Sequence, residues 1–150
     1  MDTMTPQALT LEISRRFAAT PERVFDAWLT KDWGRWLPPR GARCTVLSID
    51  PRVGGRWHLT MTMADGRDIE IVGEYRELVR PQRLVTAWTG SYNNQETVLT
   101  LTFQPDGDGT LMTLRQDGFV DAQQRDGYDQ GWNGADGSFD KLAAMLAKAS

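Results

Sequence analysis

Six tryptophans are the most unusual chemical feature of this 150-residue sequence, beside five phenylalanines, three tyrosines and six methionines. An indole ring is bulky, and its N–H usually needs a hydrogen-bond partner when it is buried. So many large rings in a small chain indicate either a core built from aromatic side chains or a pocket that such side chains line. These two interpretations frame the functional question that the sequence raises.

Side chains that commonly transfer protons or attack as nucleophiles are few. His58 is the only histidine and Cys44 the only cysteine, which excludes an intramolecular disulfide, a Cys₂His₂ or Cys₄ zinc site and a mechanism with two imidazoles. His58 shares strand parity with Thr60 and Thr62, so we expect a solvated or hydrogen-bonded surface residue. Cys44, at the head of a strand, is expected to be a small buried apolar residue rather than a nucleophile.

The acidic residues do not form a recognisable catalytic pair. Asp65, Asp106 and Asp108 lie in turn sequences, where aspartate commonly bonds the nearby backbone. The segment from Asp106 to Gly109 lacks the remaining ligands of a calcium loop, and the sequence contains neither a GxGxxG nor a GxxxxGK(S/T) motif. The sequence therefore assigns no catalytic residue, no metal ligand and no cofactor.

The composition is that of an ordinary soluble domain, with 17 basic against 20 acidic residues and 40% hydrophobic residues. The charges form no long block of one sign, so we do not expect nucleic acid as a partner. The beginning of the chain lacks the features of a signal peptide, and the longest apolar run, Leu142–Ala147, is too short to span a membrane. We expect a cytoplasmic protein without membrane insertion, folded as a single domain over residues 1–150, with a loose tail at residues 1–7.

Seven segments have the pattern of β-strands. Leu9–Phe17 alternates apolar and polar residues, as a half-buried strand does. Further strand patterns follow in unbroken succession, separated by turn sequences such as Asp65-Gly66. They are Cys44–Ile49, Arg56–Met63, Asp68–Leu78, Leu84–Thr89, Thr97–Phe103 and Thr110–Gln116. This succession with short loops predicts an antiparallel meander.

Helical patterns flank the strands. Thr20-Pro21-Glu22 supplies an N-cap, a proline at the first helical position and an acid in the first turn, which predicts a short helix. Thr30–Leu37 predicts a second one, ended by Pro38-Pro39. After Asp121 as N-cap, an apolar stripe at helical spacing predicts one long C-terminal helix. Its members are Tyr128, Trp132, Ala135, Phe139, Leu142 and Leu146.

Small residues form a second stripe on this C-terminal helix. Gly127, Gly131, Gly134 and Ser138 share one face. Each glycine inside a helix costs roughly 1 kcal/mol relative to alanine. We therefore expect either that the sheet approaches that face closely or that the glycines leave room for a ligand.

The order of elements indicates an α+β fold in which the sheet curls and the last helix packs across its concave face. Short segments over nearly the whole domain, in this order and spacing, carry a resemblance to a known family. They are Arg16-Phe17, Ala19–Trp28, Trp33–Pro38, Asp50–Trp57, Asp65-Gly66, Gly73–Tyr75, Pro81–Val85, Gly109-Thr110, Gly118-Phe119 and Gly131-Trp132. On these segments the sequence resembles the activator-of-Hsp90-ATPase-like (AHSA1-like) branch of the Bet v 1/START (SRPBCC) superfamily.

The resemblance implies a helix-grip fold. In that fold a curved antiparallel sheet of about seven strands wraps around a long C-terminal helix, and two short helices lie between strands 1 and 2. It also implies a deep cavity between the sheet and the helix.

Two features depart from the family pattern. Gln116 stands before Asp117-Gly118-Phe119, where many relatives have histidine, so the resemblance does not imply proton chemistry at this position. The chain also has no counterpart of the separate Hsp90-docking domain that the eukaryotic co-chaperones of the family carry.

Strand alternation and the aromatic residues together nominate a binding site. If Leu99 and Leu101 face inward, the inward residues of the neighbouring strands follow by alternation. The candidate ligand-binding residues are Trp28, Trp33, Trp36, Trp57, Leu59, Met61, Met63, Ile71, Tyr75, Trp88, Leu99, Met112, Gln116, Phe119, Gly131 and Trp132. The alternative is that the same residues form a packed core with no open space.

Roles can be suggested for some of these candidates. Gln116, Tyr75 and the indole N–H groups of Trp57 and Trp132 are expected to orient a ligand by hydrogen bonds. The segment Trp33–Leu37, with two tryptophans and Leu37, is expected to form a lid or rim, or else to clamp the second short helix onto the sheet.

Three functions remain open from the sequence. The first is binding of a hydrophobic or amphipathic small molecule in the cavity. The second is an enzyme of the polyketide cyclase/aromatase type, in which the cavity orients a flexible chain. The third is a stress or chaperone accessory protein acting on an Hsp90-type partner. A homodimer is also left open.

Overall fold

Seven strands form one antiparallel sheet in the order β1-β7-β6-β5-β4-β3-β2. The computed structural model describes residues 9–148, so the expected tail at residues 1–7 lies outside the described part. The strands are β1 (Thr10–Phe17), β2 (Arg43–Ile49), β3 (Arg56–Thr62), β4 (Asp68–Val79), β5 (Arg83–Gly90), β6 (Glu96–Asp106) and β7 (Gly109–Asp117). All seven expected strands are confirmed, with ends shifted by a few residues.

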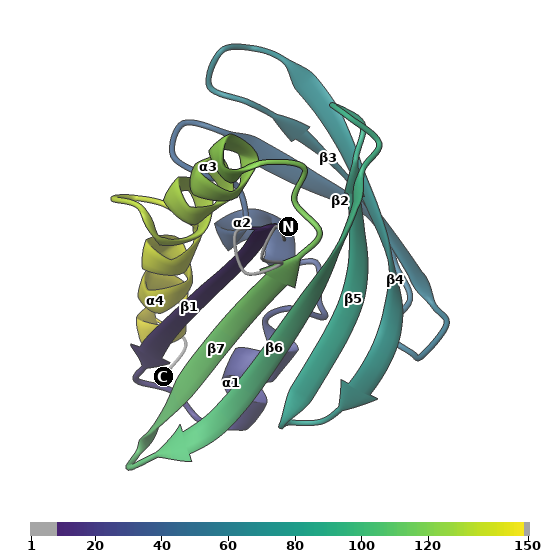
Figure 1. Cartoon of the computed structure of the whole chain (residues 1–150). Coiled ribbons are helices and arrows are strands. Elements are labelled where there is room, and N and C mark those ends of the chain that lie inside the picture. Colours follow the sequence, from purple (N-terminus) through teal and green to yellow (C-terminus); the bar gives the residue numbers. More distant parts are fainter. Residues whose placement is uncertain (1–8, 149–150) are drawn as a thin grey trace, which may run out of the picture.

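The first strand pairs with the last one. Ile13 of β1 lies opposite Leu114 of β7, and all other neighbours in the sheet are consecutive in sequence. Because β1 and β2 lie at opposite edges, the segment between them must cross the concave side of the sheet. The two short helices α1 (Pro21–Asp26) and α2 (Trp33–Trp36) lie on this crossing. Figure 1 shows them inside the curve of the sheet.

Local signals explain where the helices begin. The Thr20 hydroxyl accepts a hydrogen bond from the Arg23 backbone N–H at 3.3 Å, and Pro21 occupies the first turn of α1. The Asp121 carboxylate accepts from the Gln124 N–H at 2.8 Å and caps α3 (Ala122–Asn133). Both N-caps are thus confirmed.

The C-terminal helical segment is interrupted. It consists of α3 and α4 (Ser138–Lys148), separated at Gly134–Gly137. Gly134 is extended (φ −73°, ψ 171°) and Asp136 adopts a positive φ of 57°. A Cβ on Gly137 would lie 2.7 Å from the Gly131 carbonyl oxygen, so only glycine fits there. The single continuous helix expected from the apolar stripe is therefore two helices, and Ala135 of that stripe is exposed.

Both C-terminal helices lie on the inner side of the curved sheet (Figure 1). This arrangement, with seven antiparallel strands and short helices between β1 and β2, is the helix-grip fold. The fold class expected from the sequence is confirmed. No helix within residues 9–148 is both long and apolar enough to cross a membrane.

Four tryptophans fill one part of the concave side. We call Trp28, Trp33, Trp36 and Trp57 the tryptophan cluster; all four are at most 2% exposed. Ring centroids lie 4.7 Å apart for Trp28 and Trp36 and 4.8 Å apart for Trp33 and Trp57, both in edge-to-face geometry. Such contacts are favourable for aromatic rings and leave little free space. Three of the four rings come from α2 and the turn between α1 and α2, so these short segments are clamped onto the sheet.

Candidate ligand-binding site

An apolar cavity of about 330 Å³ lies between the sheet and α3. This volume is at the lower end of the range of small-molecule sites. The sheet side contributes Met61, Met63, Arg67, Ile69, Ile71, Trp88 and Tyr92, and the segment after α2 contributes Leu37 and Pro39. The helical side contributes Gln124, Gly127, Tyr128, Gly131, Trp132 and Ser138.

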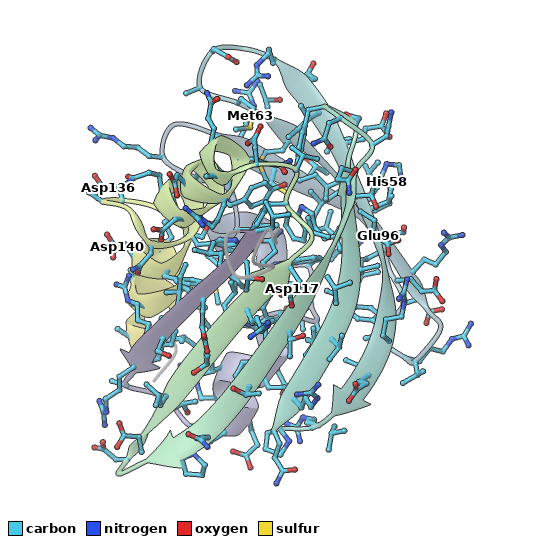
Figure 2. All side chains as sticks on the ribbon, in the orientation of Figure 1. His58, Met63, Glu96, Asp117, Asp136 and Asp140 are labelled. Carbon is cyan, nitrogen blue, oxygen red and sulfur yellow. The ribbon has the colours of Figure 1, made fainter. Side chains whose placement is uncertain are left out.

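The sheet wall of the cavity follows from the register of the β3–β4 hairpin. Met61 pairs with Ile69, and Leu59 pairs with Ile71, so these side chains share the concave face. Met61 and Ile71 are buried, whereas Met63 and Ile69 are half-buried toward the open end. Figure 2 shows Met63 beside α3, where the hairpin and the helix face each other.

Two residues of the helical wall are glycines, so α3 leaves space open on its side of the cavity. A Cβ on Gly127 would meet no atom within 4 Å, and a Cβ on Gly131 would meet only Pro39, at 3.6 Å. Of the two expectations for this face, close approach of the sheet is not observed at Gly127. At this position the glycine faces open space.

The tyrosine at the mouth depends on a different glycine. A Cβ on Gly90 would lie 2.0 Å from the ring of Tyr92, so glycine allows this ring to fold back against the end of β5. The Tyr92 ring lies 6.4 Å from the Tyr128 ring and is 40% exposed. The two tyrosines thus border the opening from the sheet side and from α3.

Polar atoms of the deeper wall are already paired within the protein. The Trp88 indole donates to the Tyr128 hydroxyl at 3.0 Å. The Ser138 hydroxyl bonds the Leu37 carbonyl and lies 3.2 Å from the Gly131 carbonyl oxygen. These bonds tie α3 and α4 to the sheet and to the segment after α2, and they leave the cavity floor apolar.

Six of the sixteen candidate residues line this cavity. They are Met61, Met63, Ile71, Trp88, Gly131 and Trp132. The other ten are buried elsewhere in the core and do not line it: Trp28, Trp33, Trp36, Trp57, Leu59, Tyr75, Leu99, Met112, Gln116 and Phe119. Of the expected rim, Trp33 and Trp36 belong to the tryptophan cluster, and only Leu37 reaches the cavity. Aromatic residues therefore form a packed core in one part of the concave face and line a pocket in another part.

Gln116 is fully buried and uses both ends of its amide inside the protein. Its Oε1 accepts from the Trp132 indole at 3.0 Å, and its Nε2 donates to the Thr97 hydroxyl at 3.0 Å. Thr97 donates in turn to the Trp88 carbonyl at 3.2 Å. Gln116 thus orients the indole of a cavity wall, rather than contacting the cavity itself.

Two other expected hydrogen-bond donors also lie away from the cavity. The Trp57 indole donates to the Thr86 hydroxyl at 2.8 Å. The Tyr75 hydroxyl is buried without a partner among the described residues, and burial raises its pKa well above the ordinary value. Neither side chain lines the cavity.

Several lining residues were not among the sequence candidates. Some carried a usable signal: Ile69 shares strand parity with Ile71, Tyr128 shares the helical stripe with Trp132, and Gly127 lies on the glycine stripe. Arg67 and Tyr92 carried none, because they lie in connecting segments whose direction no periodicity predicts. The same holds for Pro39, Gln124 and Ser138, which meet the cavity only through tertiary packing.

The lone histidine is hydrogen-bonded on the surface as expected, whereas the lone cysteine is less buried than expected. His58 Nε2 lies 2.7 Å from Glu70 Oε1, and His58 does not line the cavity. Figure 2 shows His58 on the side of the sheet opposite the C-terminal helices. Cys44 is half-buried, and burial raises the pKa of its thiol to about 11, so it remains protonated at neutral pH. Within residues 9–148, no three His, Cys, Asp or Glu side chains gather as possible metal ligands.

Comparison with protein families places this fold and cavity in a known group. The family model described as "Activator of Hsp90 ATPase homolog 1-like protein" (AHSA1) matches residues 18–147. The chain belongs to the AHSA1 family. AHSA1-family proteins are part of the SRPBCC superfamily, so the resemblance seen in the sequence is confirmed. A comparison with curated protein sequences finds no match.

Solved structures similar to this AHSA1-family chain share its whole architecture. Protein CV1439 from Chromobacterium violaceum is 30% identical with a TM-score of 0.84, covering 92% of this chain and 96% of its own. A protein from Rhodobacter sphaeroides is 27% identical, with a TM-score of 0.80 and 95% of both chains covered. An AHSA1 protein from Silicibacter pomeroyi is 23% identical, with a TM-score of 0.79 and 94% and 99% covered, and shows the fold alone.

Proposed function

We propose that this AHSA1-family protein binds a hydrophobic or amphipathic small molecule in the cavity between the sheet and α3. The observation that carries the proposal is the pair Gly127 and Gly131. Both line the cavity, and neither glycine is required by a close approach of other atoms. Alanine at either position would favour the helix by roughly 1 kcal/mol, so the open space is kept at a cost in helix stability.

The cavity wall suits apolar ligands. Met61 and Met63 are flexible, polarisable side chains that adapt to ligand shape. Trp88 and Trp132, whose ring centroids lie 5.6 Å apart, offer broad apolar surfaces with fixed orientation. Burial of apolar ligand surface against them would contribute about 25 cal/mol per Å² before the entropic costs of binding.

The cavity volume limits the size of the ligand. A water molecule occupies about 30 Å³ in the liquid, and packed organic atoms need similar space. A cavity of about 330 Å³ thus holds on the order of ten to fifteen non-hydrogen atoms. This corresponds to a medium-length alkyl chain or a two-ring aromatic molecule.

Binding is the function that the lining residues support best. Within the described residues, the cavity wall offers apolar contacts and hydrogen-bond donors but no carboxylate or imidazole. No observation in residues 9–148 specifically favours a cyclase-type reaction or an Hsp90-type partner over binding.

A neutral fluorescent probe, N-phenyl-1-naphthylamine, tests the proposal. We expect saturable fluorescence enhancement with the wild-type protein. Gly127→Leu would place a side chain in the open space and weaken probe binding at least tenfold. Gln123→Leu adds the same side chain at an exposed position of α3 that does not line the cavity, and serves as the matched control. Absence of probe binding, or equal binding by Gly127→Leu and wild type, would contradict the proposal.

A further inference from the structure

One charged side chain borders the cavity. Arg67 is the single ionised residue among the described residues that line it, and it follows the Asp65-Gly66 turn of the β3–β4 hairpin. Gln124 lines the same cavity from the first turns of α3. A positive charge beside an otherwise apolar space gives the site a polar end and an apolar end.

Asp65 holds this arginine in place. Its carboxylate accepts from the Arg67 backbone N–H at 3.0 Å and from Arg67 Nε at 2.8 Å. These two hydrogen bonds lower the pKa of Asp65, so the carboxylate stays ionised at neutral pH. Guanidinium carries five N–H donors in a planar fork. Asp65 engages only Nε, and within residues 9–148 the terminal Nη1 and Nη2 atoms have no hydrogen-bond partner.

Two other polar side chains at the cavity keep donors that no described residue uses. Gln124 uses its Oε1 to accept from the Val120 N–H at 2.9 Å, which leaves its Nε2 hydrogens available. The Tyr128 hydroxyl oxygen accepts from the Trp88 indole, which leaves its own hydrogen available. A ligand group that only accepts hydrogen bonds would match this set.

We propose that the ligand is an amphipathic monocarboxylate whose carboxylate binds the Nη1 and Nη2 edge of Arg67 while its apolar part fills the cavity. The inference rests on the proposed function and adds the chemistry of the ligand's polar end. Planar guanidinium and carboxylate groups match in a two-bond, fork-to-fork geometry. Because Asp65 already pairs with Nε, the site carries little net positive charge. A singly charged carboxylate therefore fits it better than a doubly charged phosphate monoester.

A matched pair of probes tests the inference. Decanoate and decanol have the same chain length and differ in the charged head group, and both fit the expected ligand size. Without a cationic partner, decanoate should bind more weakly than decanol, because a carboxylate loses more hydration on burial. With Arg67 in place, we expect wild-type protein to bind decanoate about fivefold more tightly than decanol at low salt. This preference should shrink as ionic strength rises.

Two arginine variants test whether Arg67 causes the preference for decanoate. Arg67→Met should bind decanol as wild type does and bind decanoate more than fivefold more weakly than wild type does, which reverses the preference. Arg56→Met removes the same charge from an exposed position on the outer face at the other end of β3, and should keep the wild-type preference. Isothermal titration calorimetry measures all six affinities of the three proteins for the two compounds, and thermal melts check that the variants are folded.

The outcomes separate this inference from the proposed function. If wild-type protein binds decanol as tightly as or more tightly than decanoate, or if Arg67→Met keeps the preference for decanoate, the inference is wrong and the proposed function stands. If neither compound binds, the proposed function is wrong and the inference falls with it.

Discussion

The concave face of this sheet has two parts that behave differently. In one part, the rings of the tryptophan cluster are buried and pack in edge-to-face contacts. In the other part, between the β3–β4 hairpin and α3, a cavity of about 330 Å³ remains open. Both parts face the same sheet, and β3 contributes to each of them through Trp57 and Met61.

The difference comes from the helices that cover each part. The segment that carries α1 and α2 brings three tryptophans onto the sheet, whereas α3 presents Gly127 and Gly131 to it. A sheet face alone therefore does not determine whether space is packed or open. The volume of the side chains on the covering helix determines it.

The largest expected effect is on stability in the packed part. Trp57→Ala should destabilise the protein by about 3–5 kcal/mol, since it removes a buried ring and leaves a void among neighbouring rings. Ile69→Ala, at the open part, should cost less than about 1.5 kcal/mol, because the half-buried side chain borders existing space. Urea unfolding of both variants measures the contrast. Equal losses would show that the two parts are packed alike.

The next effect concerns the buried amide that connects the two parts. Gln116→Leu should destabilise the protein by about 1–3 kcal/mol, because the buried Trp132 indole loses its acceptor and the Thr97 hydroxyl loses one of its two hydrogen bonds. Probe binding should also weaken, since Trp132 forms a wall of the cavity. Gln104→Leu, an exposed position on β6, is the control and should change stability by less than about 0.5 kcal/mol. A stability loss with unchanged probe affinity would show that Gln116 does not influence ligand binding through Trp132.

These two parts also differ in how far the sequence predicts them. Strand alternation correctly orients Trp57, Leu59 and Met61 inward, because a half-buried strand has a strict period of two. It cannot tell which inward residues border open space, since that depends on the segment that covers them. Trp33 and Trp36 of α2 were expected either at the rim of a pocket or as a clamp of this helix onto the sheet, and they are buried in the core.

The C-terminal segment illustrates the same limit. Its apolar stripe correctly predicts the face that packs on the sheet, as Trp132, Phe139 and Leu142 are buried. The interruption at Gly134–Gly137 does not disturb the spacing of that stripe enough to be visible in the sequence. The glycine stripe indicates that this helix face does not simply face solvent. The low helix propensity of glycine alone does not distinguish close approach of other atoms from an open cavity.

A smaller effect should appear in the acid stability of the helices that cover the open part. The Arg15 guanidinium bonds Asp140 of α4, and this hydrogen bond, with one from the Asp136 backbone, lowers the pKa of the Asp140 carboxyl. The stabilisation is present above the ordinary aspartate pKa of 3.8 and is lost as pH falls through the lower pKa of the folded state. Melting temperatures of Asp140→Asn should therefore fall less steeply than those of wild type between about pH 5 and pH 2. An identical slope would show that this ion pair does not contribute to acid stability.

The smallest effect is expected on the outer face. His58→Gln should leave probe affinity within about twofold of wild type, because His58 bonds Glu70 on the side of β3 opposite Met61. A loss of probe affinity beyond tenfold, which equals about 1.4 kcal/mol, would mean that residues on the outer face affect ligand binding in the cavity.

Indole N–H signals test the central contrast between the two parts most directly. The six tryptophans give separate indole signals in a ¹H–¹⁵N correlation spectrum, assigned by single Trp→Phe variants. Titration with decanol should shift the signals of Trp88 and Trp132 most, because both rings line the cavity. The signals of the tryptophan cluster should move least. Largest shifts within the cluster, or no shifts at all, would contradict the account.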